Sequence, residues 1–157
     1  MKNAIILLFV LLIYGISSCV QPRKTVAAYQ NMEVQFIRIV QNEKICIKVF
    51  AKGNNRKECI EQAKIDAVKA VVFDGIRTAP DSRPLYAASI SEIKVADFFE
   101  NFFNENGSYK EYVTLNNGGN ISRDDQFNLG DKTQIGVELI VDRKGLRNHL
   151  INASILK

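Results

Sequence analysis

The sequence predicts an α+β domain in which an antiparallel or mixed sheet of about four strands carries helices on one face, in the order ββααββα. Two runs rich in β-branched and aromatic residues, 34–40 and 45–51, follow one another across a short polar segment, as in a β-hairpin. A capped amphipathic helix is predicted next, at residues 56–74. Residues 133–141, near the C-terminus, alternate most regularly and predict the best strand of the chain.

The start of the chain has the organisation of a secretory signal. Lys2 supplies a positive charge, and the apolar block at residues 4–14 has the length of a signal-peptide hydrophobic region but is short for a membrane span. The block ends at small residues and a cysteine, and the chain then turns polar. The alternative is a plain signal peptide or an anchor helix that happens to contain a cysteine. The short run and the polar sequence after it disfavour a spanning helix.

The stretch Ile16-Ser17-Ser18-Cys19 resembles the lipobox of bacterial lipoproteins. The resemblance implies that the Cys19 thiol is acylated and that the signal is cleaved between Ser18 and Cys19. Each buried CH₂ of an acyl chain contributes about 0.8 kcal/mol, so two or three chains hold a protein stably on a membrane. The expected division is a lipoprotein signal peptide at residues 1–18, a lipidated tether at residues 19–32 and a single α+β periplasmic domain at residues 33–157.

The residues after Cys19 bear on which membrane holds the protein. Val20 stands where enteric lipoproteins retained in the inner membrane carry Asp, and no acidic cluster like that of surface-exposed lipoproteins follows. By this resemblance the protein is expected at the outer membrane, facing the periplasm. Of the 21 Lys and Arg residues only Lys2 lies in the signal, which leaves 20 against 17 Asp and Glu. That excess is too small to indicate nucleic acid as a partner.

The predicted hairpin and helix define two faces of the sheet. In the second strand Ile45, Ile47, Val49 and Ala51 share one face, and Cys46, Lys48 and Phe50 share the other. Asn55 with Glu58 is typical of a helix N-cap and its capping-box partner, and Gly75 ends the helix. The alanine-rich apolar stripe of this helix includes Cys59 and is expected to pack on the face of Ile45. Cys46 then points away from Cys59, so the sequence predicts two buried free thiols.

This hairpin, followed by "AKGNNRKECIEQAKIDAVKAVVFDGI", resembles the small α+β domain of certain envelope lipoproteins and of the N-terminal part of flagellar assembly protein T. The resemblance covers under a third of the chain and is carried mostly by a packing pattern. It implies a role as a part of an envelope assembly, with no enzymatic activity to carry over.

The second half of the chain predicts a loop at residues 76–84 and a second helix at residues 91–104 with a broad phenylalanine face. A strand is predicted at residues 109–115, followed by a long polar loop at residues 116–132. After the strand at 133–141, Asp142 is positioned to cap a last helix.

The sequence offers little chemistry to a catalytic site. The single histidine, His149, could be combined with Cys59 and Asp142 into a nucleophilic set, but no local motif supports it. Cys46, Cys59 and His149 lack the paired spacing of metal ligands, and no phosphate loop or dinucleotide fingerprint is found. We therefore expect no enzyme, no substrate, no metal and no cofactor beyond the covalent lipid on Cys19.

These observations favour an outer-membrane lipoprotein that acts as a non-enzymatic structural or assembly factor of an envelope or secretion apparatus. A membrane, through the lipid anchor, and a periplasmic protein are the expected partners. The alternative is a small-ligand or cell-wall binding lipoprotein, which should show a concave pocket lined by convergent polar groups. The candidate partner surface consists of Phe98 and Phe102 on the second helix and of Arg123, Asp124 and Asp125 in the long loop. The simpler interpretation of the phenylalanine stripe is that it belongs to the core, and that of the paired carboxylates is that they lie in a solvated loop.

Overall fold

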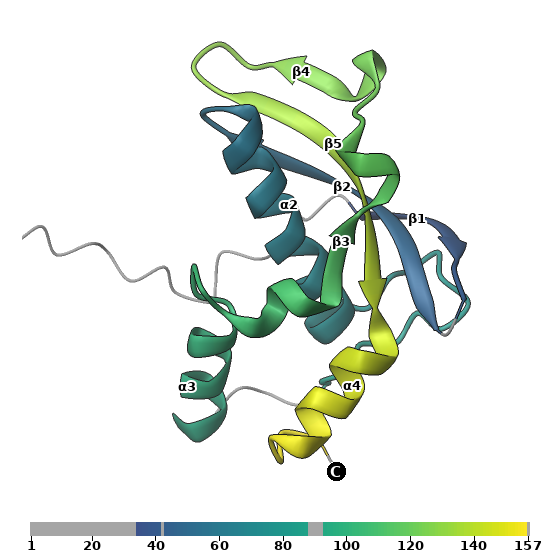
Figure 1. Ribbon diagram of the computed structural model, residues 1–157, viewed down its shortest axis with the longest axis vertical. Coiled ribbons are helices and arrows are strands. Elements are labelled where there is room, and N and C mark those ends of the chain that lie inside the picture. The colour runs from purple at the N-terminus through teal and green to yellow at the C-terminus, as the bar shows by residue number, and fades with distance from the viewer. Residues whose placement is uncertain (1–33, 42, 88–92, 157) are drawn as a thin grey trace, which may run out of the picture. The chain divides into compact units, whose positions relative to one another are not determined.

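A computed structural model of the protein describes residues 34–41, 43–87 and 93–156. The expected signal peptide, Cys19 and the tether lie outside the described residues, as do the first two residues of the predicted second helix. The described part has the α+β architecture that the sequence predicts, with an open antiparallel sheet and helix α2 lying across one of its faces (Figure 1).

The sheet is built around two long antiparallel strands, β2 (Lys44–Gly53) and β5 (Thr133–Asp142). Strand β1 (Val34–Ile39) pairs with the free side of β2. The free side of β5 pairs with two short strands, β3 (Val113–Leu115) and β4 (Gln126–Asn128), which gives the path β1-β2-β5-β3 with β4 also on β5. The described sheet therefore has five strands, and β4 was not predicted from the sequence.

Among the described residues strand β1 forms one edge of the sheet, and its pairing with β2 is irregular. The register between β1 and β2 shifts between Phe36 and Arg38, so Ile37 is an extra residue in a β-bulge. The Phe36 amide points away from β2 and donates a hydrogen bond to Thr78 Oγ1 at 3.3 Å. The loop that follows helix α2 is thereby tied to the strand edge.

Helix α2 (Arg56–Lys69) begins as the sequence predicts. Asn55 Oδ1 accepts a hydrogen bond from the Glu58 amide at 3.0 Å, and the Glu58 carboxylate accepts one from the Asn54 amide at 3.0 Å. The helix continues as a π-helical turn, η2 (Ala70–Asp74), which Gly75 ends at a φ of 71°. Two carbonyl groups at this end accept hydrogen bonds from the following segment, whose Leu85 and Tyr86 amides bond to η2.

The face of the sheet that carries Ile45, Ile47 and Val49 packs against α2, as predicted. Alanines on α2 let the helix approach this face closely, since Ala63 and Ala67 are fully buried. We call this side of the sheet the inner face. The opposite side, which we call the outer face, carries Cys46, Lys48 and Phe50 from β2 and Gly136, Glu138 and Ile140 from β5.

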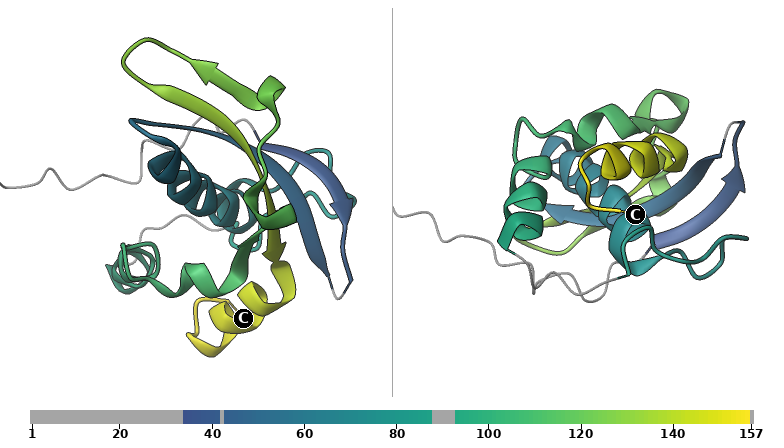
Figure 2. Two further views of the ribbon diagram at one scale, coloured as in Figure 1. Left: turned by 45° about the horizontal axis from the view of Figure 1, so that its top comes forward. Right: turned by 90° about the horizontal axis from the view of Figure 1, so that it is seen from below.

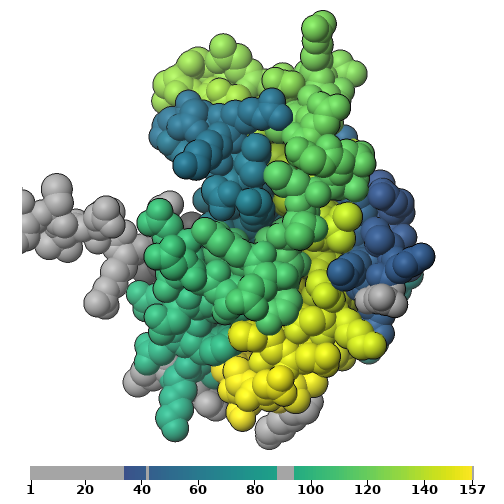
Figure 3. All heavy atoms as spheres, in the orientation of Figure 1, coloured from purple at the N-terminus to yellow at the C-terminus, as the bar shows by residue number. Residues whose placement is uncertain are grey.

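Helices α3 (Ile93–Phe102) and α4 (Arg143–Asn152) lie at the end of the sheet farthest from β4, with the 3₁₀ helix η3 (Ser108–Tyr112) beside them (Figure 2). In the space-filling view α4 and the segment from α3 to η3 form one continuous surface there (Figure 3). Asp142 caps α4, as predicted, by accepting a hydrogen bond from the Gly145 amide at 2.8 Å. The aromatic rings that meet in this region are Phe73, Tyr86, Phe98, Phe99, Phe102, Phe103, Tyr109, Tyr112 and His149.

Two sequence predictions are wrong in this half of the chain. Residues 109–112 are the 3₁₀ helix η3 and not the first half of a strand, because Tyr109 and Tyr112 both turn inward and a spacing of three suits that helix. The predicted loop at residues 116–132 contains two further 3₁₀ turns, η4 (Asn116–Gly119) and η5 (Arg123–Asp125), and strand β4. Its polar composition hid β4, whose three residues are all exposed.

The two cysteines of the described residues are free thiols, as the strand parity predicts. Cys46 lies on the outer face and Cys59 on the helix that packs against the inner face, and both are fully buried. Burial raises the pKa of Cys46 more than the neighbouring Arg38 guanidinium lowers it. Burial and the nearby Glu58 carboxylate raise the pKa of Cys59, whose thiol donates a hydrogen bond to the Thr133 carbonyl at 3.3 Å. Both thiols are consequently poor nucleophiles at neutral pH.

Candidate functional site: an acidic notch on the outer face

Strands β3 and β4 leave a gap along β5, and the connecting residues 116–125 fold over the outer face at this gap. Together with β2 and β5 they line a hollow of about 480 Å³ that is open to solvent. We call it the acidic notch. It is lined by Lys48, Asn117, Asn120, Ser122, Asp124, Asp125, Gly136 and Glu138.

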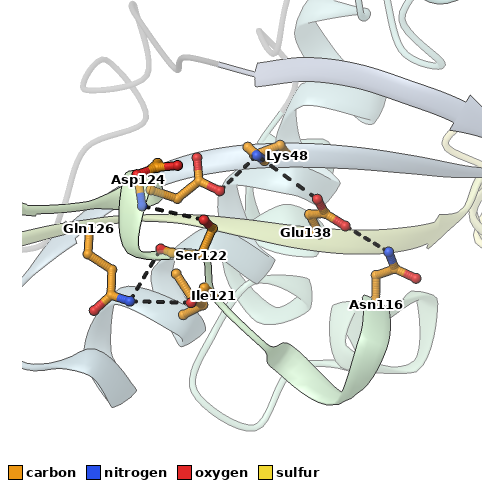
Figure 4. Close-up of polar contacts among 8 residues, drawn as sticks. Lys48, Asn116, Ile121, Ser122, Asp124, Gln126 and Glu138 are labelled. Carbon is orange, nitrogen blue, oxygen red and sulfur yellow. Dashed lines mark hydrogen bonds and ion pairs between the residues drawn. The ribbon is translucent and has the colours of Figure 1, made fainter.

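The ammonium group of Lys48 faces two carboxylates of the notch, and its contact with Glu138 is drawn in Figure 4. Its Nζ is 2.8 Å from Asp125 Oδ2 and 4.0 Å from Glu138 Oε1. Glu138 is held from its other side by Asn116, whose Nδ2 donates a hydrogen bond to Oε2 at 2.8 Å. Side chains from β2, β5, η4 and η5 are thus joined in one polar network.

Local sequence explains why the connecting segment can fold so closely over the sheet. Gly136 has no side chain to hold η5 away, since a Cβ there would lie 2.8 Å from the Phe50 ring and 3.1 Å from the Asp125 Cβ. Asn117 and Gly118 adopt left-handed backbone angles, which asparagine and glycine tolerate. Ser122 Oγ accepts a hydrogen bond from the Asp124 amide at 3.4 Å and so caps η5.

The same segment is anchored on the helix side of the sheet. Ile121 is buried in the core, and Arg56 at the start of α2 donates a hydrogen bond to the Gly119 carbonyl at 3.0 Å. Gln126 Nε2 donates to the carbonyls of Ile121 and Ser122, at 3.3 and 3.2 Å. The segment that borders the notch is therefore held in place by the core and by hydrogen bonds.

The notch has a formal charge of −2, because one ammonium faces three carboxylates, those of Asp124, Asp125 and Glu138. An aromatic pair borders it on the outer face: the rings of Phe50 and Phe127 are 6.2 Å apart, and Phe127 is 44% exposed. Carboxylates beside exposed aromatic rings suit a partner that presents Lys or Arg next to apolar surface. Amide and hydroxyl groups in the same hollow suit a polyhydroxylated ligand.

The structure brings together some of the predicted site residues and separates others. Arg123, Asp124 and Asp125 form η5, and both aspartates line the notch. Phe102 is 3% exposed and stacks between Phe98 and Tyr112, so it belongs to the core and the prediction of a partner surface there needs correction. Phe98 is half-buried in the same aromatic cluster.

Sequence reasoning missed Lys48 and Glu138 as site residues. Both lie on the strand faces opposite the predicted core face, for which no function was predicted from the sequence. Lys48 and Glu138 lie opposite one another in the register of β2 and β5. This register is a property of the assembled sheet, so no local sequence signal could have identified the pair.

The nucleophilic set considered from the sequence is not assembled in the described part of the chain. The Cys59 thiol bonds to Thr133, the Asp142 carboxylate caps α4, and the His149 ring contacts Phe98, Phe102 and Tyr112. Each group is engaged with a different partner.

Within residues 34–41, 43–87 and 93–156, no group of three or more His, Cys, Asp or Glu side chains is arranged to hold a metal ion. None of the helices in those ranges combines the length and apolar character needed to cross a membrane. No protein-family model, curated protein or solved structure matches the chain.

Proposed function

We propose that the protein is an outer-membrane lipoprotein that acts as a non-enzymatic assembly factor, and that its domain docks a periplasmic protein through the acidic notch and the adjoining aromatic pair. The observation that carries the proposal is the notch itself, an open surface with net negative charge beside an exposed phenylalanine. Exposed apolar groups that are rimmed by polar residues are a feature of protein-contact sites.

The proposed anchor complements this surface. A lipid on Cys19 and a tether of roughly a dozen residues keep the domain close to partners on the same membrane, which raises its effective concentration for them. A modest intrinsic affinity at the notch is then sufficient. The partner surface that fits carries Lys or Arg side chains for Asp124 and the remaining carboxylates, with apolar groups for Phe127.

Photocrosslinking in cells tests the docking surface. A photoreactive residue at Phe127 is expected to capture a defined protein, whereas one at Ile151, which is 45% exposed on α4, is not. Asp124→Arg should abolish or strongly reduce capture from position 127, because the Asp124 side chain faces the notch without pairing with Lys48. Glu111→Arg, at an exposed position on η3, makes the same charge change elsewhere and should leave capture intact. Equal capture at both positions, or equal loss with both charge reversals, would contradict the docking surface.

Cys19→Ala tests the anchor separately. Intact-mass analysis of the unaltered protein is expected to show a chain that starts at Cys19 and carries acyl groups, and Cys19→Ala should lack that mass and leave the membrane fraction with high salt or carbonate. Cys46→Ala removes another cysteine and should keep both the lipid and the anchoring. A mature chain that begins elsewhere, or a normally processed and anchored Cys19→Ala protein, refutes the lipobox.

A second candidate function, binding of a polar cell-wall fragment, has one observation in its favour. Asn117, Asn120 and Ser122 converge on a hollow of about 480 Å³, as expected of a site for hydroxyl-rich ligands. Calorimetric titration with soluble peptidoglycan fragments separates the two functions. Saturable binding that Asp125→Asn weakens, together with no specific capture at position 127, selects the ligand-binding function.

A further inference from the structure

A second hollow, of about 310 Å³, lies between α4 and residues 81–87. Its charged lining consists of Asp81, Arg83, Arg143 and Arg147, and Pro84 and Leu85 contribute apolar surface. We call it the basic hollow, since three guanidinium groups face one carboxylate and its formal charge is +2. Its charge is opposite in sign to that of the acidic notch, and the proposed function makes no use of it.

Arg143 is the central group of the basic hollow. The residue is 7% exposed, and its Nη2 donates hydrogen bonds to Asp81 Oδ2 and to the Arg83 carbonyl, each at 2.9 Å. A guanidinium group carries five N–H donors, and these two bonds use both donors of Nη2. Nε and Nη1 of Arg143 donate to no other residue in the described ranges.

These remaining donors are not sealed inside the protein. Among the described residues no fully buried side-chain nitrogen or oxygen lacks a hydrogen-bond partner, so the unused N–H groups of Arg143 retain some exposure, and Arg143 lines the hollow. A largely buried guanidinium group is poorly solvated by water. Its unused N–H donors can therefore bind an anion that enters the hollow.

The surrounding groups add to this capacity. Arg147 lies one helical turn after Arg143, so both project on the same side of α4. The Arg83 side chain is 88% exposed, and its Nε lies 3.6 Å from Asp81 Oδ1 at the rim of the hollow. The wall opposite α4 is held in place, since the Leu85 and Tyr86 amides bond to the carbonyls of Val71 and Val72 at 3.1 and 2.8 Å.

Asp81 is the one group here that opposes an anion. Partial desolvation raises the pKa of its carboxyl group, but the charge of Arg143 and hydrogen bonds from Arg143 and Arg83 outweigh this and lower the pKa below its ordinary value. Asp81 is therefore ionised at neutral pH and orients Arg143. Its negative charge balances one guanidinium and leaves two in excess.

We infer that the basic hollow binds a phosphate group, through the unused N–H groups of Arg143 and the guanidinium groups of Arg83 and Arg147. Arginine matches the tetrahedral oxygens of phosphate well, and the group can belong to free phosphate or to a phospholipid headgroup. The inference is independent of the acidic notch and of the lipid anchor.

Calorimetric titration of the full chain with inorganic phosphate, in nonionic detergent at constant ionic strength, tests the site. Saturable binding is expected, and Arg147→Ala and Arg83→Ala should each weaken it by about three- to tenfold, as for the loss of one charge-assisted contact. Lys144→Ala removes an exposed positive charge from the same helix outside the hollow and should leave the affinity unchanged. Asp81→Asn should strengthen binding, a gain that impaired folding cannot produce.

Absence of saturable binding, or an equal loss with Lys144→Ala and Arg147→Ala, overturns the inference. The source of the phosphate is decided by repeating the titration in micelles doped with phosphatidylglycerol. If the lipid displaces inorganic phosphate from the unaltered protein, the site takes a headgroup. If phosphate binding is unchanged by the lipid, the site takes free phosphate.

Discussion

Replacing Gly75 with alanine is expected to destabilise the domain by about 2–5 kcal/mol, from backbone strain together with steric overlap. Gly75 has φ 71° and ψ 170°, a region that is almost exclusive to glycine. An added Cβ would also lie 1.9 Å from the Ser82 carbonyl oxygen, so the loop that follows η2 must move. The free energy of unfolding of the full chain, measured by urea denaturation, is the quantity to compare.

Gly118→Ala provides the matched control. Gly118 also has a positive φ, 65°, but a Cβ there meets no atom within 4 Å and its ψ of 16° lies near the left-handed region that other residues can enter. We expect a loss of about 1 kcal/mol at this position. Similar losses for both variants would show that the contact between Gly75 and Ser82 is not important for stability.

Leu139→Ala is expected to lower the free energy of unfolding by about 3–4 kcal/mol, the range for a large-to-small change in a closely packed core. Leu139 is fully buried at the centre of the inner face, opposite Ile47 on β2 and Leu115 on β3. Removing its side chain leaves a cavity that flanking strands on both sides prevent from closing.

Ile140→Ala, one residue later, tests the assignment of the two faces. Ile140 has the same number of side-chain atoms but lies half-buried on the outer face, so we expect a loss of about 1 kcal/mol in the same denaturation experiment. If the two variants lose equal stability, the alternation of β5 between core and outer face is incorrect.

Local signals made much of this fold predictable. The cap formed by Asn55 and Glu58 and the stop at Gly75 depend on residues a few positions apart, and both are confirmed. The parity of β2 correctly separated Cys46 from Cys59 because alternation is a local property of a strand. Residues 109–112 were misassigned because their order of polar and apolar residues was taken as alternation, whereas contacts with α2 and α4 turn both tyrosines inward at a spacing of three.

The candidate site was only partly predictable. Asp124 and Asp125 drew attention as adjacent carboxylates in a long polar segment, but Lys48, the ion-pair partner of Asp125, is 77 residues away from it in the chain. Lys48 and Glu138 meet only once β2 and β5 are in register, and no local pattern specifies that register. The phenylalanine stripe of α3 was ambiguous for the same reason, since the sequence did not show that Tyr112 and His149 would cover Phe102.

The irregular edge at β1 disfavours aggregation when many copies of the protein are crowded together. Strands on exposed sheet edges can pair between molecules and begin aggregation, especially when they are apolar, as Ile37 and Ile39 make this one. The bulge at Ile37 breaks the regular row of donors and acceptors, Thr78 already occupies the Phe36 amide, and Arg38 places a charge on the strand. An incoming strand therefore finds no continuous template, and the edge is protected against growth into fibrils.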